Sequence, residues 1–144
     1  MTTLNRRYTF DANLQLKDAG LIAATGNGTV GGSAKVLDLG TGRVDTRAII
    51  DVTAIETDTG DEIYTIQIQG SNAVGFGSGV VNLAEKKMGK ASLTGESADT
   101  STGRFELPFT TDVDGVIYEF VRVHVIVAGT IATGINFTAW LPKA

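Results

Sequence analysis

Residues 120–127, FVRVHVIV, carry the clearest structural signal in the sequence. Every second side chain is a valine, and the side chains between them are mixed in character. Successive side chains of an extended chain point to opposite sides, so one face carries Val121, Val123, Val125 and Val127. Such alternation predicts a β-strand with one buried face, and side chains branched at Cβ fit the pleated surface of a sheet. We therefore predict a long strand here.

The same alternation, or a short apolar run, recurs along most of the chain. The segments that we predict as strands are 12–17, 20–25, 35–39, 44–55, 63–71, 104–109, 116–127 and 135–142. The sequence contains 19 Thr, 13 Val and 11 Ile, which favour strands, and 18 Gly, which favour the turns between them. Pro108 lacks a backbone N–H, so its strand is predicted to lie at a sheet edge or to contain a bulge. The pattern predicts an all-β protein.

An antiparallel β-sandwich of about eight strands suits this pattern, and a jelly roll of two packed sheets is the preferred arrangement. Strand order is not visible in the periodicity, so an immunoglobulin-like sandwich also fits. One segment departs from the alternation. In residues 80–90 apolar side chains recur at helical spacing, and Gly89 suits a helix end, so a short helix is predicted. Residues 1–144 are predicted to form one domain with a short N-terminal arm over about residues 1–10.

Composition excludes several classes of function. The chain has 144 residues, of which 42% are hydrophobic and none is cysteine, so neither a disulfide framework nor a thiolate site is available. Its formal net charge of −4 disfavours direct binding to nucleic acid or to an anionic membrane. Arg122 and His124 interrupt the most apolar run, which is also too short to span a bilayer. We expect a soluble protein made in the cytoplasm.

Two motifs with known chemistry are better explained as turns. Residues 26–31, GNGTVG, match the glycine spacing of a dinucleotide-binding loop, but the glycine-bounded segment that follows is too short for the helix that such a loop requires. Residues 111–115, TDVDG, resemble the start of a calcium loop, but the twelfth position from Asp112 is Val123, which offers no ligand oxygen. We predict a flexible loop for the first motif and a hairpin turn for the second.

The sequence predicts no enzyme, cofactor or metal site. His124 is the only histidine, and no GxSxG nucleophile motif accompanies it. A glycosidase would need two carboxylates at a defined separation, which the mere presence of 16 acidic residues does not indicate. We predict a structural or interface role for His124.

The strand around His124 has apolar residues on both faces, because Phe120 and Ile126 lie opposite the valines. We hypothesise that a neighbouring subunit covers this second face. Phe76 lies in a glycine-rich loop and is predicted to be exposed or in contact with a partner. A basic pair near the N-terminus could contact an acidic partner. The candidate interface residues are thus Arg6, Arg7, Phe76, Phe120, Arg122, His124 and Ile126.

Residues 49–79, IIDVTAIETDTGDEIYTIQIQGSNAVGFGSG, resemble the capsid cement (decoration) proteins of tailed bacteriophages. Residues 14–25, LQLKDAGLIAAT, and the valine-rich strand near the C-terminus fit the same family in order. The resemblance implies a small jelly-roll protein without enzymatic activity, located on the capsid exterior of the virion. It also implies two partners, which are the major capsid protein and further copies of the chain as a homodimer or homotrimer. The resemblance assigns no individual interface residue.

Two other classes of function stay open. A carbohydrate- or ligand-binding β-sandwich on a phage or cell surface would use exposed aromatic side chains, for which Trp140 and Phe76 are the candidates. A small hydrolase on a sandwich scaffold would have to use His124.

Overall fold

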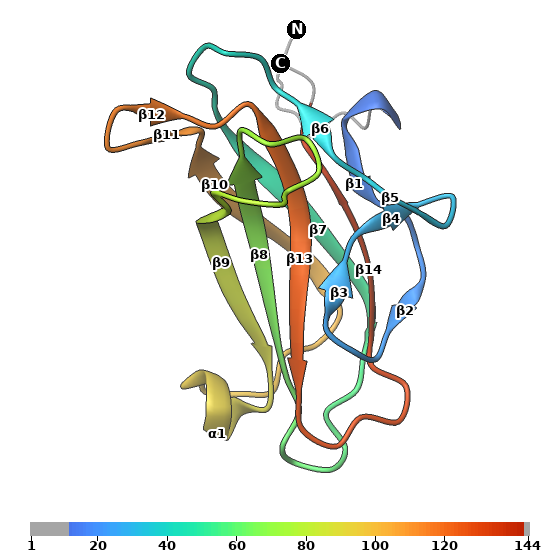
Figure 1. The fold of residues 1–144 in the computed structure, drawn as a ribbon. Helices are drawn as coiled ribbons and strands as arrows, with labels where there is room; N and C mark the ends of the chain where they lie inside the picture. Colours follow the sequence, from blue (N-terminus) through green and yellow to red (C-terminus); the bar gives the residue numbers. More distant parts are fainter. Residues whose placement is uncertain (1–11, 143–144) are drawn as a thin grey trace, which may run out of the picture.

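The structure is a computed structural model that describes residues 12–142, and it is an all-β sandwich (Figure 1). The first sheet contains β1 (Gln15–Lys17), β2 (Leu21–Ile22), β14 (Ile135–Trp140), β7 (Asp45–Ile55) and β10 (Gly103–Thr110). The second sheet contains β3 (Gly26–Asn27), β6 (Leu37–Asp38), β13 (Phe120–Ala128), β8 (Ile63–Ser71) and β9 (Val81–Gly89). The smaller elements are a 3-10 helix (Ala12–Leu14), the hairpin β4 (Thr29–Val30) and β5 (Ser33–Ala34), α1 (Ala91–Thr94), and the hairpin β11 (Asp112–Val113) and β12 (Val116–Ile117).

The strand order is that of a jelly roll, because the strand pairings are nested. The short strands β1 and β2 pair with the last strand, β14, and β3 and β6 pair with β13. In the middle of the chain, β7 pairs with β10 and β8 pairs with β9, and all of these pairings are antiparallel. Eight strand positions are therefore folded as one long hairpin that wraps into two sheets. This order confirms the predicted jelly-roll sandwich.

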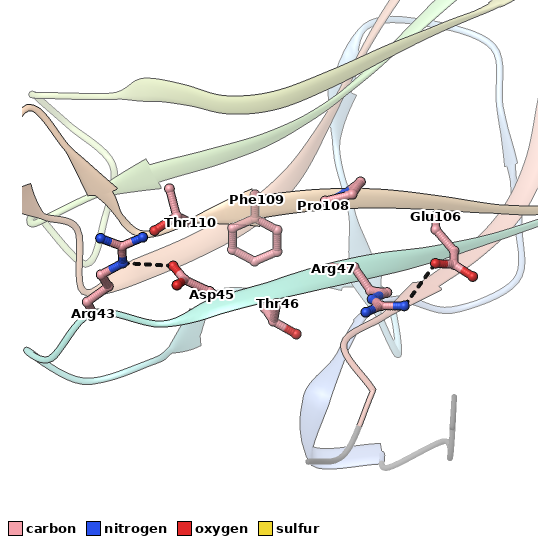
Figure 2. Close-up of a pocket in the computed structure, with 8 residues that line it drawn as sticks. All are labelled: Arg43, Asp45, Thr46, Arg47, Glu106, Pro108, Phe109 and Thr110. Carbon is pink, nitrogen blue, oxygen red and sulfur yellow. Dashed lines mark hydrogen bonds and ion pairs between the residues drawn. The ribbon is translucent and has the colours of Figure 1, made fainter. Parts of the chain in front are cut away.

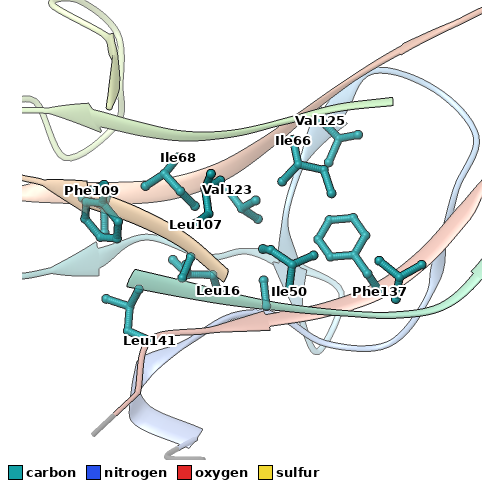
Figure 3. Packing of buried hydrophobic residues seen from close by; sticks show 14 of the residues in the cluster. Leu16, Ile50, Ile66, Ile68, Leu107, Phe109, Val123, Val125, Phe137 and Leu141 are labelled. Carbon is teal, nitrogen blue, oxygen red and sulfur yellow. The ribbon is translucent and has the colours of Figure 1, made fainter. Parts of the chain in front are cut away.

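The hydrophobic core fills the space between the two sheets (Figure 3). The predicted alternation is confirmed in β8, β13 and β14, whose inward side chains are fully buried: Tyr64, Ile66, Ile68, Val121, Val123, Val125, Ile135, Phe137 and Ala139. From β7 and β10, the core receives Ala48, Ile50, Val52, Leu107 and Phe109. Removing these apolar side chains from water supplies the main driving force for folding, at about 25 cal/mol for each Å² of apolar surface buried.

The predicted helix over residues 80–90 is wrong, because this segment is strand β9. The pairing of β8 with β9 shifts register between Ile68 and Gln69, so that Ile68 faces Ala84 and Gln69 faces Asn82. The extra residue, Leu83, forms a β-bulge that interrupts the alternation of β9. The one short helix of the described chain, α1, begins just after this strand.

The TDVDG motif forms the predicted hairpin turn, whereas residues 26–31, which were predicted as a flexible loop, contain the short strands β3 and β4. Asp114 and Gly115 both have a positive φ, 52° and 85°, which is the geometry of the tight two-residue turn that joins β11 to β12. The glycine-rich segment forms short strands and no helix follows it. Gly28 is required here by packing, since a Cβ at this position would lie 2.7 Å from the carbonyl oxygen of Leu16 and would collide with Val123. Pro108 lies in β10, which is an edge strand as predicted.

Lys17, the last residue of β1, is buried although it carries a charge. Its side chain is 3% exposed, and its ammonium group donates hydrogen bonds to the carbonyl oxygens of Asp18 (2.8 Å), Gly20 (2.9 Å) and Phe137 (2.7 Å). Burial lowers the pKa of Lys17 to about 8, and the nearby Asp18 carboxylate opposes this shift. The ammonium group therefore joins the segment between β1 and β2 to β14.

Within residues 12–142, no helix has the length and apolar character needed to cross a bilayer.

Candidate functional site

The outer surface of the second sheet is the strongest candidate for a functional site, and we call it the polar face. It comprises the outward side chains of β3, β13, β8 and β9: Asn27, Gln67, Gln69, Asn82, Glu85, Lys87, Phe120, Arg122, His124 and Ile126. The inward valines of β13 orient the strand, so its alternate residues point outward. Four of the predicted interface residues lie together here. Phe120, Arg122 and His124 are partly exposed, and Ile126 is 39% exposed.

A continuous row of hydrogen bonds crosses the polar face from β13 to β9. The Nε of Arg122 donates to Oε1 of Gln69 at 2.9 Å, and Nε2 of Gln69 donates to Oε1 of Gln67 at 3.0 Å. Nε2 of Gln67 donates to Oε1 of Glu85 at 2.9 Å, and the same oxygen accepts from Nδ2 of Asn82 at 3.1 Å. These side chains are held in place before any partner binds. Less conformational entropy is therefore lost on binding.

His124 lies beside this row and is held in a fixed orientation. Its Nδ1 is 2.7 Å from Oδ1 of Asn27 on β3. Burial lowers the pKa of His124, and the positive charge of Arg122 on the same face lowers it further. A neutral imidazole must donate its Nδ1 proton to this amide oxygen, because the oxygen can only accept. His124 thus bonds to a structural asparagine rather than to a serine, which gives no support to a serine hydrolase arrangement.

Phe76 is buried, which excludes the first of its two predicted alternatives, exposure, while contact with a partner stays a prediction. The side chain is only 7% exposed, and the guanidinium carbon of Arg122 lies 4.2 Å from the centre of its ring. An arginine can cover an aromatic ring in this way because the cation is attracted to the negative face of the ring. The loop between β8 and β9 (residues 72–80) therefore folds back onto the polar face, with Phe76 beneath Arg122.

Hydrogen bonds hold this loop at its base. The hydroxyl of Ser71 donates to the carbonyl oxygen of Ser78 at 2.9 Å and accepts from the backbone N–H of Ala73 at 3.0 Å. The N–H of Phe76 donates to the carbonyl oxygen of Ala73 at 2.8 Å. Local sequence did not reveal this arrangement, because the contact that orders the loop comes from Arg122, far along the chain.

The remaining sequence candidates are not part of this site. Arg6 and Arg7 lie outside the described residues. Trp140 is 5% exposed, so neither Trp140 nor Phe76 offers an open ring for stacking against a sugar, and the aromatic platform suggested for carbohydrate binding is wrong. Among residues 12–142, no group of three or more potential ligand side chains is arranged to hold a metal ion.

Two carboxylates with lowered pKa values, Glu56 and Asp61, stabilise loops at one end of the sandwich. Glu56 accepts hydrogen bonds from the backbone N–H groups of Gly134, Thr133 and Ala132, in that order of influence, and these bonds lower its pKa. Asp61 accepts from the N–H and the hydroxyl of Thr130. Both carboxylates are occupied by the chain itself, so neither is arranged as a general acid or base.

A shallow groove of about 560 Å³ lies on the other sheet (Figure 2). It is lined by Arg43, Asp45, Thr46, Arg47, Glu106, Pro108, Phe109 and Thr110. Its two arginines are already paired, since Arg43 lies 2.9 Å from Asp45 and Arg47 lies 3.1 Å from Glu106. The groove therefore offers no free cation for an anionic ligand.

No protein-family model matches the chain, and no curated protein sequence matches it either.

Proposed function

We propose that the protein is a structural component of a phage virion, which binds the outer surface of the capsid and links neighbouring capsomers. The main support is the polar face, a broad and preordered surface of amide, acidic and basic side chains on a rigid sheet. A surface of this kind suits binding to another protein, since protein interfaces combine a desolvated centre with ordered polar groups. The resemblance of residues 49–79 points the same way, and this stretch supplies most of β7, all of β8 and the loop beneath Arg122.

We further propose that the polar face packs against a second copy of the chain, in a homodimer or homotrimer. Ile126 and Phe120 would supply apolar contact, and the row from Arg122 to Glu85 would supply polar contact. An oligomer that touches several capsid subunits gains strength from multivalency, so each contact can be weak. The acidic net charge of the chain fits a role that involves neither nucleic acid nor membrane.

The experiment is to mix the purified protein with undecorated heads of the phage that encodes it. Electron cryo-microscopy should show added density on the outer surface, and the decorated heads should release their DNA at a higher temperature. Folded protein that adds no density to the shell would refute the proposal.

Self-association is tested separately by sedimentation at micromolar concentration. Ile126→Asp should shift the protein toward monomer, because it places a charge in the proposed interface. Leu21→Asp is the matched control, since Leu21 is 57% exposed but lies in β2 of the other sheet. A wild-type protein that is strictly monomeric would contradict this part of the proposal.

A further inference from the structure

One end of the sandwich carries an unusual share of the exposed apolar side chains. Six large apolar side chains of the described residues are exposed, and three of them belong to two segments at this end: Val74 (65%), Val80 (39%) and Val116 (46%). The segments are the loop between β8 and β9 and the β11–β12 hairpin, which both lie in the upper half of Figure 1. We call the surface formed by Val74, Val80 and Val116 the valine end.

The two segments are joined by one side chain, so they form a single surface. Asn72 donates through Nδ2 to the carbonyl oxygen of Ile117 at 3.0 Å. Its Oδ1 accepts from the backbone N–H of Glu119 at 2.9 Å. Asn72 lies two residues before Val74, and Ile117 directly follows Val116. The amide thus fixes the loop against the hairpin.

The loop has the composition of a mobile segment but the contacts of a rigid one. Residues 72–80 include three glycines and no charged residue. Phe76 nevertheless has a φ of 54°, a left-handed conformation that costs a residue other than glycine on the order of 1 kcal/mol. The buried contact with Arg122 compensates for this cost. Residues held in such conformations cluster at functional sites, and a preordered loop binds a partner with a smaller entropy loss.

A pair of acidic side chains adjoins the valine end. Asp38 ends β6, and Glu119 directly precedes β13 and bonds to Asn72 through its backbone N–H. The pKa of Glu119 is raised, first by burial and then by its hydrogen bond to Asp38 and the charge of Asp38. Among the ion pairs of residues 12–142, none involves either carboxyl group. Two adjacent acids without a basic partner make this edge of the surface attractive to a cationic one.

We propose that the valine end is the surface that docks onto the capsid, against an apolar recess flanked by lysine or arginine side chains of the capsid protein. This inference rests on the proposed function and specifies which part of the molecule performs it. The apolar residues would supply the buried contact, and Asp38 and Glu119 would face the basic side chains. The polar face, from Phe120 to Ile126, would stay available for a second copy of the chain.

Binding to undecorated heads tests the apolar part of the surface. Co-sedimentation over a range of protein concentrations gives the apparent affinity of wild type, Val74→Asp and Leu93→Asp. Leu93 is the matched control because it is 47% exposed in α1, at the opposite end of the sandwich (Figure 1). We expect Val74→Asp to weaken binding at least about tenfold and Leu93→Asp to change it less than about twofold. Both variants should melt at the wild-type temperature, since both positions are exposed.

The acidic part is tested by salt dependence. The double variant Asp38→Asn and Glu119→Gln should bind several-fold more weakly at low salt and should lose most of the salt dependence of wild type. Asp58→Asn is the control, because Asp58 is exposed in the loop between β7 and β8 at the other end.

The outcomes separate the two proposals. If wild type decorates the heads and Val74→Asp decorates them equally well, the docking surface is wrong and the cement function stands. A similar loss of affinity for the heads in Val74→Asp and Leu93→Asp would also refute the docking surface, because the two positions lie at opposite ends of the sandwich. If folded wild type does not bind the heads, the cement function fails and the docking surface fails with it.

Discussion

The contact between Arg122 and Phe76 should contribute measurable coupling to the stability of the protein. The guanidinium group lies 4.2 Å from the ring centre, and both side chains are at least partly removed from water. Cation–π contacts contribute about 0.5–1 kcal/mol when exposed and about 2 kcal/mol when desolvated. For this half-buried pair we expect a coupling energy of about 1 kcal/mol.

The measurement is a double-mutant cycle of Phe76→Leu and Arg122→Met, with the free energy of unfolding obtained from urea denaturation. Both replacements keep an apolar side chain in place. Arg122→Met also removes the hydrogen bond to Gln69, but this loss occurs in both arms of the cycle and cancels. A coupling energy below about 0.3 kcal/mol, the usual error of additivity, would refute the idea that Arg122 holds the loop.

The pair formed by Lys86 and Phe105 provides a comparison within the same molecule. Its ammonium nitrogen lies 5.0 Å from the ring centre, which is farther than in the first pair. The same cycle with Lys86→Met and Phe105→Leu should give about 0.5 kcal/mol or less. A larger coupling here than at Arg122 would show that the distances do not rank the two contacts.

Three further predictions concern stability. Lys17→Met should lower the free energy of unfolding by about 2–3 kcal/mol at pH 7, because three carbonyl oxygens lose a charged donor. The pKa of Lys17 is about 8 in the fold and 10.5 for an ordinary lysine, so the unfolded chain binds more protons between these pH values. The free energy of unfolding should therefore rise from pH 8 toward pH 10 in wild type but not in Lys17→Met. Above pH 10 Tyr64 should oppose the rise, because its pKa is raised to about 12 in the fold and the unfolded chain loses this proton first. Glu56→Gln should lower the melting temperature at pH 7, because the ionised Glu56 accepts hydrogen bonds from three backbone N–H groups. The depressed pKa of Glu56 means that its stabilisation of the fold is present above about pH 4.5 and is lost as the pH falls below that value. The variant should therefore lose less stability than wild type over this acidic range. Gly28→Ala should cost about 1–3 kcal/mol by overpacking against Val123, as measured by chemical denaturation.

The sequence predicted the strands that have one buried and one exposed face. In β8 and β13 the alternation places Ile66 and Val123 in the core with no ambiguity, because a slip of one residue would expose the whole apolar face. The nested pairing of the strands could not be predicted from this alternation, because each strand pairs with a partner that is distant in the sequence. The preference for a jelly roll came from the number of predicted strands in a chain of this length, and the strand order confirmed it.

The errors have physical causes in particular residues. The bulge at Leu83 shifts the apolar positions of β9 by one residue, so that their spacing along the sequence matches that of a helix. Phe76 lies between glycines and was predicted to be exposed or in contact with a partner, but a distant arginine of the same chain covers it. Lys17 is buried because three backbone carbonyls solvate its ammonium group in place of water. Each of these features depends on a tertiary contact, which a local sequence window does not contain.

The nested pairing of strands has a consequence for synthesis on the ribosome. Strand β14 lies between β1 and β7 in the first sheet, so the last strand of the described residues occupies an interior position. A nascent chain that lacks residues 135–140 would leave the facing edges of β1 and β7 open and part of the core uncovered. The sandwich therefore cannot close until residues 135–140 have been made, and chains cut short before them would expose core surface to proteases and chaperones.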